Sequence, residues 1–420
     1  MIKAQRGTVD VLPSESYKWQ YLEEIAREVA KKHNISEVRT PTFEATELFV
    51  RGDGEGSDVV NKEMYTFLDK GDRSITLKPE GTAGVVRCGI EHSIFNGVLP
   101  SKQFYITPVF RYEKPQNGRL REHHQFGVEL FGSKSPKMDA DAILTACEFF
   151  NKIGIKDVVV RLNSIGCGEC RPKYLSALKD FYSAKIDTMC EDCKTRYNKN
   201  ILRVLDCKNH ECKQITVKAP STLDYLCDDC KAHMDKLLRI LDENKVNYVI
   251  DNRIVRGLDY YTKTVFEFTS NFEGNAGVIG GGGRYDNLVA NLDGADIPAA
   301  GFGIGLERIL LVLDKLGVEI PNNNILDCYI IKAGLDTNID IEIAQKLRNA
   351  GISADVDYMD RSFRSNFNYA NKINAKFVAV VGQDEYEQNS VNLKNMATGE
   401  QKLVKIEEVA NYIKEQKNEL

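Results

Sequence analysis

Residues 104–132 have the sequence FYITPVFRYEKPQNGRLREHHQFGVELFG, which is the most informative segment for the architecture of the larger part of the chain. Its two ends, 104–113 and 123–132, have the composition of β-strands, and the basic segment between them is typical of a turn-rich loop. We therefore predict a long antiparallel hairpin with a positively charged tip. Because side chains alternate along a strand, Gln125, Gly127 and Glu129 should share one face of the sheet.

The sequence around the hairpin predicts a mixed domain followed by a second one. We expect a first helix that Ser14 caps and that runs to about residue 33, and a mobile loop at RGDGEGSD (51–58). Further strands and helices are expected at 63–69, 73–78, 138–152, 157–163, 248–255, 260–268, 277–286 and 301–316. After the linker PNNN (321–324), strands and helices alternate, which predicts parallel strands with crossover helices. The prediction is an α+β protein with one domain over 1–325, a Cys-rich and α-rich insertion at about 167–246, and an α/β domain over 326–420.

Composition limits the function classes. The chain has 420 residues, with 56 basic and 61 acidic ones and a formal charge of −5, so its overall charge does not favour non-specific polyanion binding. The sequence has no run of 18 apolar residues and no visible secretory signal. We therefore expect a cytoplasmic protein that does not span a membrane.

Two common phosphate-binding motifs are excluded. There is no GxxxxGK[ST], and in GFGIGLE (301–307) Leu306 stands where the third glycine of G-x-G-x-x-G belongs. A nucleotide would therefore have to be held by arginines on an antiparallel sheet. Arg111, Arg119 and Arg121 in the hairpin are candidates, although these residues taken alone fit a surface hairpin with solvated charges somewhat better.

Several blocks resemble one family. FRYEKPQNGRLREHHQFGVE (110–129) resembles the second signature motif of class II aminoacyl-tRNA synthetases, in the form found in histidyl-tRNA synthetases. GFGIGLERIL (301–310) resembles the third motif, with Arg308 as its arginine, and Pro41 in VRTPTFE resembles the proline of the first motif. The other matching blocks are RGTVDVLP (6–13), LKPEGTAG (77–84) and two histidine-specific ones, RGLDYYTKTVFEF (256–268) and GGGGRYD (280–286).

This resemblance implies a class II catalytic domain, a C-terminal anticodon-binding domain, and ligation of histidine to tRNA(His) through histidyl-adenylate. L-histidine, ATP with Mg²⁺ and tRNA(His) would be the substrates. A homodimer is implied, with Pro41 at the subunit interface. Val9, Lys78 and Asn287 depart from the usual family residues, and none of them removes a charge assigned to the chemistry.

The resemblance also implies roles for single residues. Arg111, Arg256 and Arg308 would be catalytic. The residues that would bind ATP are Arg111, Glu113, Arg119, Arg256 and Arg308. The residues that would bind histidine are Glu80 and Thr82 at the α-ammonium, and Gln125, Glu129, Tyr260, Tyr261 and Tyr285 around the imidazole. Other interpretations remain open: Glu80 could cap the following helix, the tyrosines could pack in a core, and Gly280 to Gly283 could form either a loose loop or a close approach to a ligand.

Contacts with tRNA are predicted at two places. By resemblance, Gln116 and Arg121 in the hairpin loop would lie near the acceptor end. In the C-terminal domain, Arg361 and Arg364 lie among aromatic residues, a composition that suits unstacked bases and phosphates. A solvated amphipathic helix would have the same composition.

Eight of the 11 cysteines form pairs in the insertion. The pairs are Cys167 and Cys170, Cys190 and Cys193, Cys207 and Cys212, and Cys227 and Cys230. Because C-x2-C is a common half of a tetrahedral zinc site, two structural zinc sites of four thiolates are a candidate. The spacing does not say which pairs combine, His210 could replace one ligand, and free thiols are the alternative.

Two other functions are alternatives. A non-catalytic paralogue that senses histidine or tRNA as a regulatory subunit would be expected to lack the C-terminal domain or the arginines matched by Arg256 and Arg308. A class II synthetase for another amino acid is disfavoured by RGLDYY (256–261).

Overall fold

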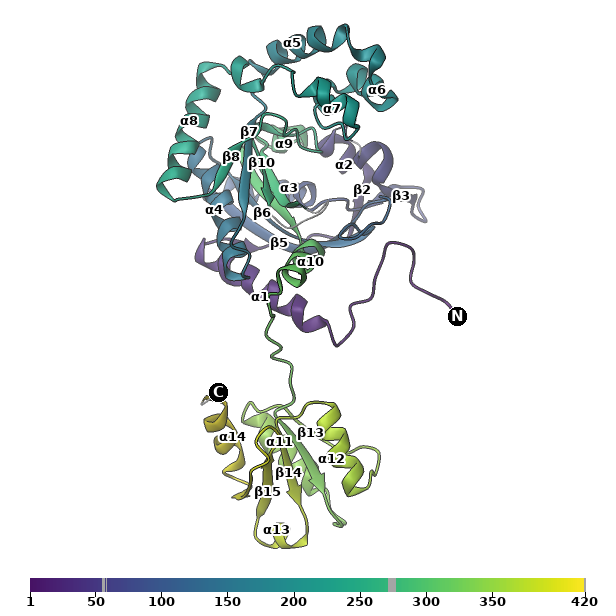
Figure 1. The fold of residues 1–420 in the computed structure, drawn as a ribbon, viewed down its shortest axis with the longest axis vertical. Coiled ribbons are helices and arrows are strands. Elements are labelled where there is room, and N and C mark those ends of the chain that lie inside the picture. The colour runs from purple at the N-terminus through teal and green to yellow at the C-terminus, as the bar shows by residue number, and fades with distance from the viewer. Residues whose placement is uncertain (55–56, 58, 271–276, 419–420) are drawn as a thin grey trace. The chain divides into compact units, whose positions relative to one another are not determined.

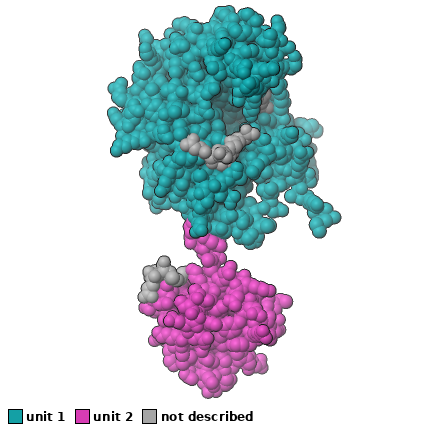
Figure 2. Space-filling model, viewed as in Figure 1, with its two compact units in different colours: residues 1–320 teal, residues 321–420 magenta. Residues whose placement is uncertain are grey.

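The computed structural model describes residues 1–54, 57, 59–270 and 277–418, and the chain divides into two compact units, Met1–Ile320 and Pro321–Leu420. Figure 2 shows the units in different colours. Each unit has a hydrophobic core of its own.

The larger unit is built on a sheet that has eight strands within the described residues (Figure 1). The order is β1-β5-β6-β11-β10-β9-β7-β8, with parallel pairing only at the two edges. The strands are β1 (Ser36–Glu37), β5 (Ser101–Phe110), β6 (Glu122–Phe131), β7 (Val159–Ser164), β8 (Tyr248–Ile250), β9 (Thr262–Thr269), β10 (Val278–Arg284) and β11 (Ala299–Gly305). The predicted hairpin is confirmed as β5 and β6, which pair along their whole length.

Long helices cover one face of this sheet and enclose the main core. They are α1 (Ser16–Lys32), α4 (Pro136–Lys152), α8 (Asp228–Glu243) and α10 (Leu306–Leu316). From β6, Phe126, Val128 and Leu130 are buried in this core. The intervening residues of β6 therefore face the other side of the sheet, as the alternation predicted.

The opposite face carries shorter elements and a second core that contains Val85, Leu288 and several tyrosines. The helices here are α2 (Thr46–Asp53), α3 (Thr82–Glu91) and α9 (Leu288–Asn291), with a π-helix η1 (Val59–Glu63) and a 3-10 turn η2 (Ile94–Asn96). A small sheet of order β2-β4-β3 lies beside them, built from β2 (Phe43–Ala45), β3 (Tyr65–Leu68) and β4 (Ser74–Leu77).

Between β7 and α8 the chain forms the α-rich insertion, which lies at one end of the larger unit (Figure 1). Its elements are α5 (Arg171–Ser183), η3 (Ile186–Thr188), α6 (Glu191–Lys199), η4 (Ile201–Val204), α7 (His210–Thr216) and η5 (Thr222–Tyr225). They enclose a small core that includes Tyr174, Leu178 and Tyr182. We expected the insertion to extend to about residue 246, but α8 packs Met234 and Leu237 into the main core instead. An amphipathic pattern does not indicate which surface a helix covers.

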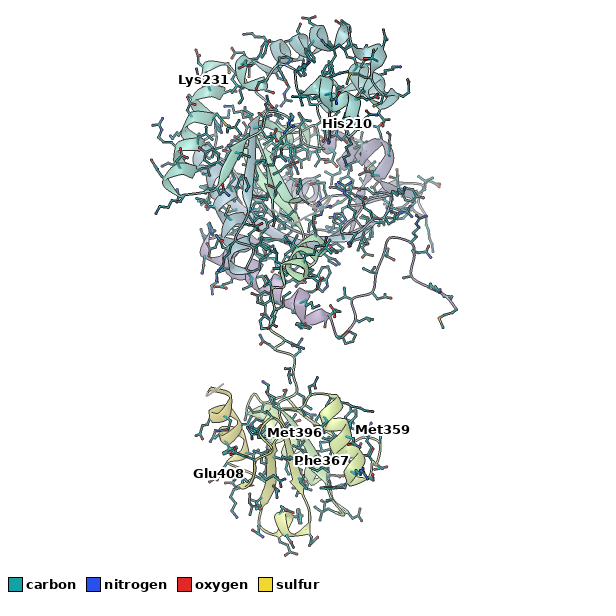
Figure 3. The ribbon with its side chains drawn as sticks, in the orientation of Figure 1. His210, Lys231, Met359, Phe367, Met396 and Glu408 are labelled. Carbon is teal, nitrogen blue, oxygen red and sulfur yellow. The ribbon has the colours of Figure 1, made fainter. Side chains whose placement is uncertain are left out.

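The smaller unit has a mixed sheet of order β13-β12-β14-β15-β16, in which β12, β13 and β14 are parallel. Its strands are β12 (Cys328–Lys332), β13 (Ala354–Val356), β14 (Phe377–Val381), β15 (Ser390–Asn395) and β16 (Gln401–Lys405). Its helices are α11 (Ile339–Asn349), α12 (Phe363–Lys372), α13 (Gln383–Glu387) and α14 (Val409–Asn418). Phe367 and Met396, labelled in Figure 3, pack against the core on the α12 side.

Some local predictions were wrong. Ser14 does not cap α1: the helix begins at Ser16, and the residue before it, Glu15, makes no capping bond through its side chain. The predicted loop 51–58 is partly helical, since α2 extends to Asp53, and residues 55, 56 and 58 lie outside the described part of the chain. The predicted strand 248–255 is shortened to β8. Within the described residues, no helix is both long and apolar enough to cross a lipid bilayer.

Candidate active site

A buried carboxyl group, that of Glu129 on β6, lies at the centre of the candidate site. Thr82 donates a hydrogen bond to its Oε1 at 2.8 Å, Tyr105 donates to the same oxygen at 3.2 Å, and Tyr285 donates to Oε2. Burial raises the pKa of Glu129 to about 8 despite these donors.

The floor of the pocket is formed by glycines on neighbouring strands. Gly301 and Gly303 of β11 lie opposite Glu129 and Gly127 of β6, and Gly281 of β10 lies opposite Gly303. A Cβ added at Gly301 would lie 2.3 Å from Glu129 Oε2, and one added at Gly127 would lie 2.2 Å from the Tyr105 ring. Backbone without side chains thus lets Glu129 and the tyrosines occupy this face.

Gln125 lies on this face as well. A Cβ at Gly303 would lie 3.9 Å from its side chain, which is ordinary contact. The sequence placed Gln125, Gly127 and Glu129 on one face, and the structure confirms this.

Tyr260, Tyr261 and Tyr285 form a cluster in the wall of the pocket. The ring centroids of Tyr260 and Tyr261 are 4.6 Å apart, those of Tyr260 and Tyr285 are 5.4 Å apart, and all three side chains are buried. They belong to the second core, so core packing is part of their role. The hydroxyl of Tyr285 nevertheless donates to Glu129, which gives the cluster a polar contact inside the pocket.

Glu80 caps the helix that follows it. Its two carboxylate oxygens accept hydrogen bonds from the backbone N–H groups of Thr82 at 2.7 Å and Ala83 at 2.6 Å, at the start of α3. The capping interpretation of Glu80 is therefore confirmed. Each carboxylate oxygen can accept a further bond, so capping leaves room for a ligand ammonium group.

Arg256 is held against β9 by an ion pair. Its Nη1 lies 2.9 Å from Glu267 Oε1, and its guanidinium lies 5.8 Å from the centre of the Tyr261 ring. The Nε of Arg256 is buried and has no hydrogen-bond partner among the described residues. A Cβ at Gly281 would lie only 2.6 Å from Arg256 Nη1, so the guanidinium rests directly on the glycine backbone of β10.

A second group of basic residues lies near the hairpin loop. Arg111 donates from Nε to the carbonyl of Pro79 at 2.8 Å. Arg308 donates to the carbonyls of Val278 at 2.6 Å and Gly118 at 3.4 Å. Burial, together with the positive charges of Arg111 and Arg308, lowers the pKa of His123 to about 3.

Arg119 and Glu113 complete this group. Arg119 Nη1 lies 3.2 Å from Glu113 Oε2. Burial and the charge of Arg119 lower the pKa of Arg308, so these two cations share one region. Arginines that repel one another in this way suit an anionic ligand.

The residues predicted to contact tRNA lie partly in internal contacts. In the hairpin loop, Arg121 stacks on Tyr112 with its guanidinium 3.9 Å from the ring centre, and Gln116 pairs with Arg119 through backbone bonds. In the smaller unit, Arg361 forms an ion pair with Asp357 and stacks on Tyr369 at 4.2 Å, whereas Arg364 is exposed on α12.

Sequence reasoning missed several residues around the site. Glu267 could have been found, because it alternates with the core residues Phe266 and Phe268. Arg171 donates to the carbonyl of Tyr261 at 2.5 Å, a contact that no local pattern signals. Asp53 is fully buried, and its two oxygens have no partner among the described residues.

A cleft of about 560 Å³ separates the insertion from the loop that carries Arg256. Leu175 and Lys179 line it on the insertion side, and Leu258 lines it on the other. Arg203 bridges the two sides by donating to the carbonyl of Arg256 at 3.2 Å. The insertion therefore contacts the backbone that positions Arg256.

The paired cysteines of the insertion assemble into two groups of four. The base cluster is formed by Cys167, Cys170, Cys227 and Cys230. The distal cluster is formed by Cys190, Cys193, Cys207 and Cys212. His210, which lies in the insertion in Figure 3, belongs to neither group. The structure thus resolves the pairing that the spacing left open.

Comparisons with known proteins agree with this geometry. The family model described as "Histidyl-tRNA synthetase" matches residues 7–309, and the one described as "Anticodon binding domain" matches residues 328–416. The chain is 51% identical over 415 residues to "Histidine--tRNA ligase" of Caldanaerobacter subterraneus subsp. tengcongensis, which covers 99% of this chain and 100% of that protein. It is 49% identical over 417 residues to the protein of the same name from Clostridioides difficile (strain 630), with 99% of each covered. Among solved structures, apo histidyl-tRNA synthetase of S. aureus has a TM-score of 0.83 at 36% identity and covers 99% of this chain and 100% of that one.

Proposed function

The chain belongs to the histidyl-tRNA synthetase family and is a histidine–tRNA ligase, and on this premise we propose how its pocket carries out the two steps of the reaction. In the first step, a carboxylate oxygen of histidine attacks the α-phosphorus of ATP. The bond to the β-phosphate breaks, and pyrophosphate leaves histidyl-adenylate behind. In the second step, a hydroxyl oxygen of the 3′-terminal adenosine of tRNA(His) attacks the acyl carbon, and AMP leaves.

Histidine is selected by polar groups on both edges of its imidazole ring. We assign Glu129 and Gln125 as its partners, with Tyr261 alongside and Tyr260 and Tyr285 completing the wall. A pocket that offers buried polar partners rejects an apolar side chain of similar shape, because those partners would be left without hydrogen bonds. The buried carboxyl of Glu129, facing the same side of the sheet as Gln125, is the observation that carries this proposal.

The α-ammonium group of histidine would lie at the start of α3. Glu80 has a buried carboxyl at this position, and Thr82 has a hydroxyl that already contacts Glu129. A cationic ligand would favour ionisation of Glu80, whose pKa burial raises in the empty pocket. The bound ammonium group would therefore counter the effect of burial and lower the pKa of Glu80.

ATP, as its Mg²⁺ complex, would be held by the basic residues around the hairpin loop. We assign Arg111 to the α-phosphate and the histidine carboxylate, Arg308 with Arg119 to the γ-phosphate, and Glu113 to the same ATP site. Arg256 would stabilise the negative charge that develops on the α-phosphate during attack. A guanidinium suits this task because it stays charged and presents a rigid fork of donors.

Contacts with tRNA(His) are proposed at two surfaces. Gln116 and Arg121 of the hairpin loop would lie near the acceptor end, and Arg361 and Arg364 would contact the anticodon region. Arg364 is the stronger candidate of the last two, because Arg361 is already paired with Asp357. The match of residues 328–416 to an anticodon-binding domain supports the assignment of the anticodon contacts to the smaller unit.

The experiment that tests the catalytic assignment is histidine-dependent ATP–pyrophosphate exchange. Arg256→Ala should lower the rate by about 10²-fold or more, the usual effect of losing one preorganised charge at a transition state. Arg73→Ala is the matched control, since Arg73 is an exposed arginine paired with Asp69 in a surface turn. Equal rates in the two variants would remove Arg256 from the mechanism.

The non-catalytic regulatory alternative gains no support. The full-length relatives at about half identity are named as ligases, and Arg256, Arg308 and the C-terminal unit are all present in this chain. A purified protein that binds histidine but shows no exchange would favour that alternative.

A homodimer in the cytoplasm is the proposed working form. Pro41 is exposed, and Phe43, Phe67 and Leu68 expose apolar side chains on the small sheet beside it. An exposed apolar surface of this kind is typical of a subunit interface. Sedimentation of the unmodified protein should give twice the chain mass of 47.3 kDa. Phe67→Glu should disrupt the interface and shift the measured mass towards that of a single chain.

A further inference from the structure

The base and distal clusters are not used by the proposed reaction. Within each cluster, the four sulfur atoms all lie within 4.8 Å of one another. In the base cluster, the Sγ atoms of Cys167 and Cys170, Cys167 and Cys227, and Cys170 and Cys230 are each 3.7 Å apart. The Sγ atoms of Cys190 and Cys207 in the distal cluster are also 3.7 Å apart.

This spacing matches a single tetrahedral metal ion. A regular tetrahedron with zinc–sulfur bonds of about 2.3 Å has sulfur–sulfur edges of about 3.8 Å. Disulfide-bonded sulfurs would lie about 2.05 Å apart, well below the observed distances. A four-iron cluster would hold its cysteine sulfurs farther apart, because irons and sulfides would lie between them.

Each cluster has a sulfur that accepts a backbone hydrogen bond. In the base cluster the backbone N–H of Cys167 donates to the sulfur of Cys170 at 3.2 Å, and in the distal cluster that of Cys190 donates to Cys212 at 3.3 Å. Four thiolates around Zn²⁺ leave two negative charges. At the base cluster, Arg171 follows Cys170 directly and can balance part of this charge.

The distal cluster lies in the insertion, which has few other interactions to stabilise its fold. Cys193, Cys207 and Cys212 are buried in the small core of the insertion. That core is enclosed by short helices and contains no strand among the described residues. Segments of this size usually need a metal or disulfides, because their cores bury too little apolar surface.

The base cluster joins the two ends of the insertion. Cys167 and Cys170 follow β7, whereas Cys227 and Cys230 stand at the start of α8, and Cys167 and Cys227 are 60 positions apart in the sequence. Arg171 then links this cluster to the pocket, because its guanidinium donates to the carbonyls of Ile165 at 3.1 Å and Tyr261 at 2.5 Å.

We propose that the insertion binds two structural zinc ions, one in the base cluster and one in the distal cluster, each through four cysteine thiolates. The distal ion holds the helices of the insertion together. The base ion fixes both ends of the insertion to the sheet next to Tyr261. This inference does not depend on the proposed roles of the catalytic residues.

Metal analysis tests the proposal directly. Full-length protein purified without chelator and saturated with zinc under reducing conditions, then freed of excess metal, should contain two zinc ions per chain. Cys167→Ser/Cys227→Ser and Cys190→Ser/Cys193→Ser should each reduce the content to one. Cys88→Ala, at a cysteine outside both clusters, should leave it at two.

X-ray absorption of the unmodified protein gives a measurement that does not rely on the variants folding. The zinc should be surrounded by four sulfurs at about 2.3 Å and by no nitrogen or oxygen. Fewer than two zinc ions in the unmodified protein, iron in place of zinc, or a mixed sulfur and nitrogen shell would each overturn the assignment. A distal double variant that keeps both ions would overturn it as well.

Discussion

Replacing Gly281 by alanine should lower the kcat/KM of histidine activation about a hundredfold. The added Cβ would lie 2.6 Å from Arg256 Nη1, whereas ordinary contact begins at 3.4 Å, so the guanidinium would have to retreat by about 0.8 Å. A displacement of about 1 Å in a positioned catalytic group can reduce the rate by about 10²-fold, or about 2.7 kcal/mol of transition-state stabilisation. Pyrophosphate exchange at subsaturating histidine and ATP measures the effect.

Gly303→Ala is the matched control. Gly303 lies directly opposite Gly281 on the neighbouring strand, but a Cβ there would meet only the Gln125 side chain at 3.9 Å. Its kcat/KM should stay within about threefold of that of the unmodified protein, because ordinary contact requires no rearrangement. Equal losses in both variants would indicate that any side chain on this floor is harmful, and no loss in Gly281→Ala would refute the position assigned to Arg256.

Stability has to be measured alongside activity. The new Cβ at Gly281 would also lie 2.8 Å from the carbonyl oxygen of Phe266, and overpacking of this kind costs about 1–3 kcal/mol. Thermal melting shows whether the variant is folded at the assay temperature. If the variant is folded and its circular dichroism is unchanged, the loss of activity can be attributed to the displacement of the Arg256 guanidinium.

Three further outcomes are expected. Folding raises the pKa of Glu129 from 4.5 to about 8, so protonation of this carboxyl group stabilises the ligand-free protein. This stabilisation is fully present below pH 4.5 and is lost as the pH rises to 8. Glu129→Gln should therefore flatten the fall in melting temperature measured between about pH 6 and 8. Arg284→Met should destabilise the larger unit by about 3–5 kcal/mol in urea unfolding, since the buried Asp139 loses its guanidinium partner and keeps, among the described residues, only the longer contact with His233 at 3.4 Å, and the added change Asp139→Leu should recover much of the loss. Arg364→Ala should weaken tRNA binding and reduce its salt dependence by about one phosphate contact in filter binding, whereas a charge-retaining Arg364→Lys should not.

The alternation of side chains on the hairpin strands was enough to predict the central face of the site. Gln125, Gly127 and Glu129 follow a period of two, and Phe126 and Val128 between them fill the core. Local patterns also predicted most helices and strands, since each depends on residues near in sequence. This part of the fold could be predicted because the signal is local.

What the sequence did not predict depends on contacts between distant segments. The cysteine pairs could not be matched, because the base cluster joins residues 60 positions apart through the path of the insertion. The contact of Arg171 with Tyr261 spans 90 positions. Arg284 lies inside a motif that resembles ligand-binding residues, yet it is fully buried against Asp139, and only the packing of α4 reveals that.

The meeting of both ends of the insertion at the base cluster also bears on how such a module can change. The two ends of the segment between Cys170 and Cys227 lie side by side, so this segment starts and finishes at nearly the same place on the sheet. The interior of the module can lengthen, shorten or be exchanged for another sequence without altering the gap that β7 and α8 must bridge. A graft that keeps Arg171 and an arginine in the place of Arg203 therefore offers a way to redesign the outer wall of the cleft while preserving the contacts with the backbone of Tyr261 and Arg256.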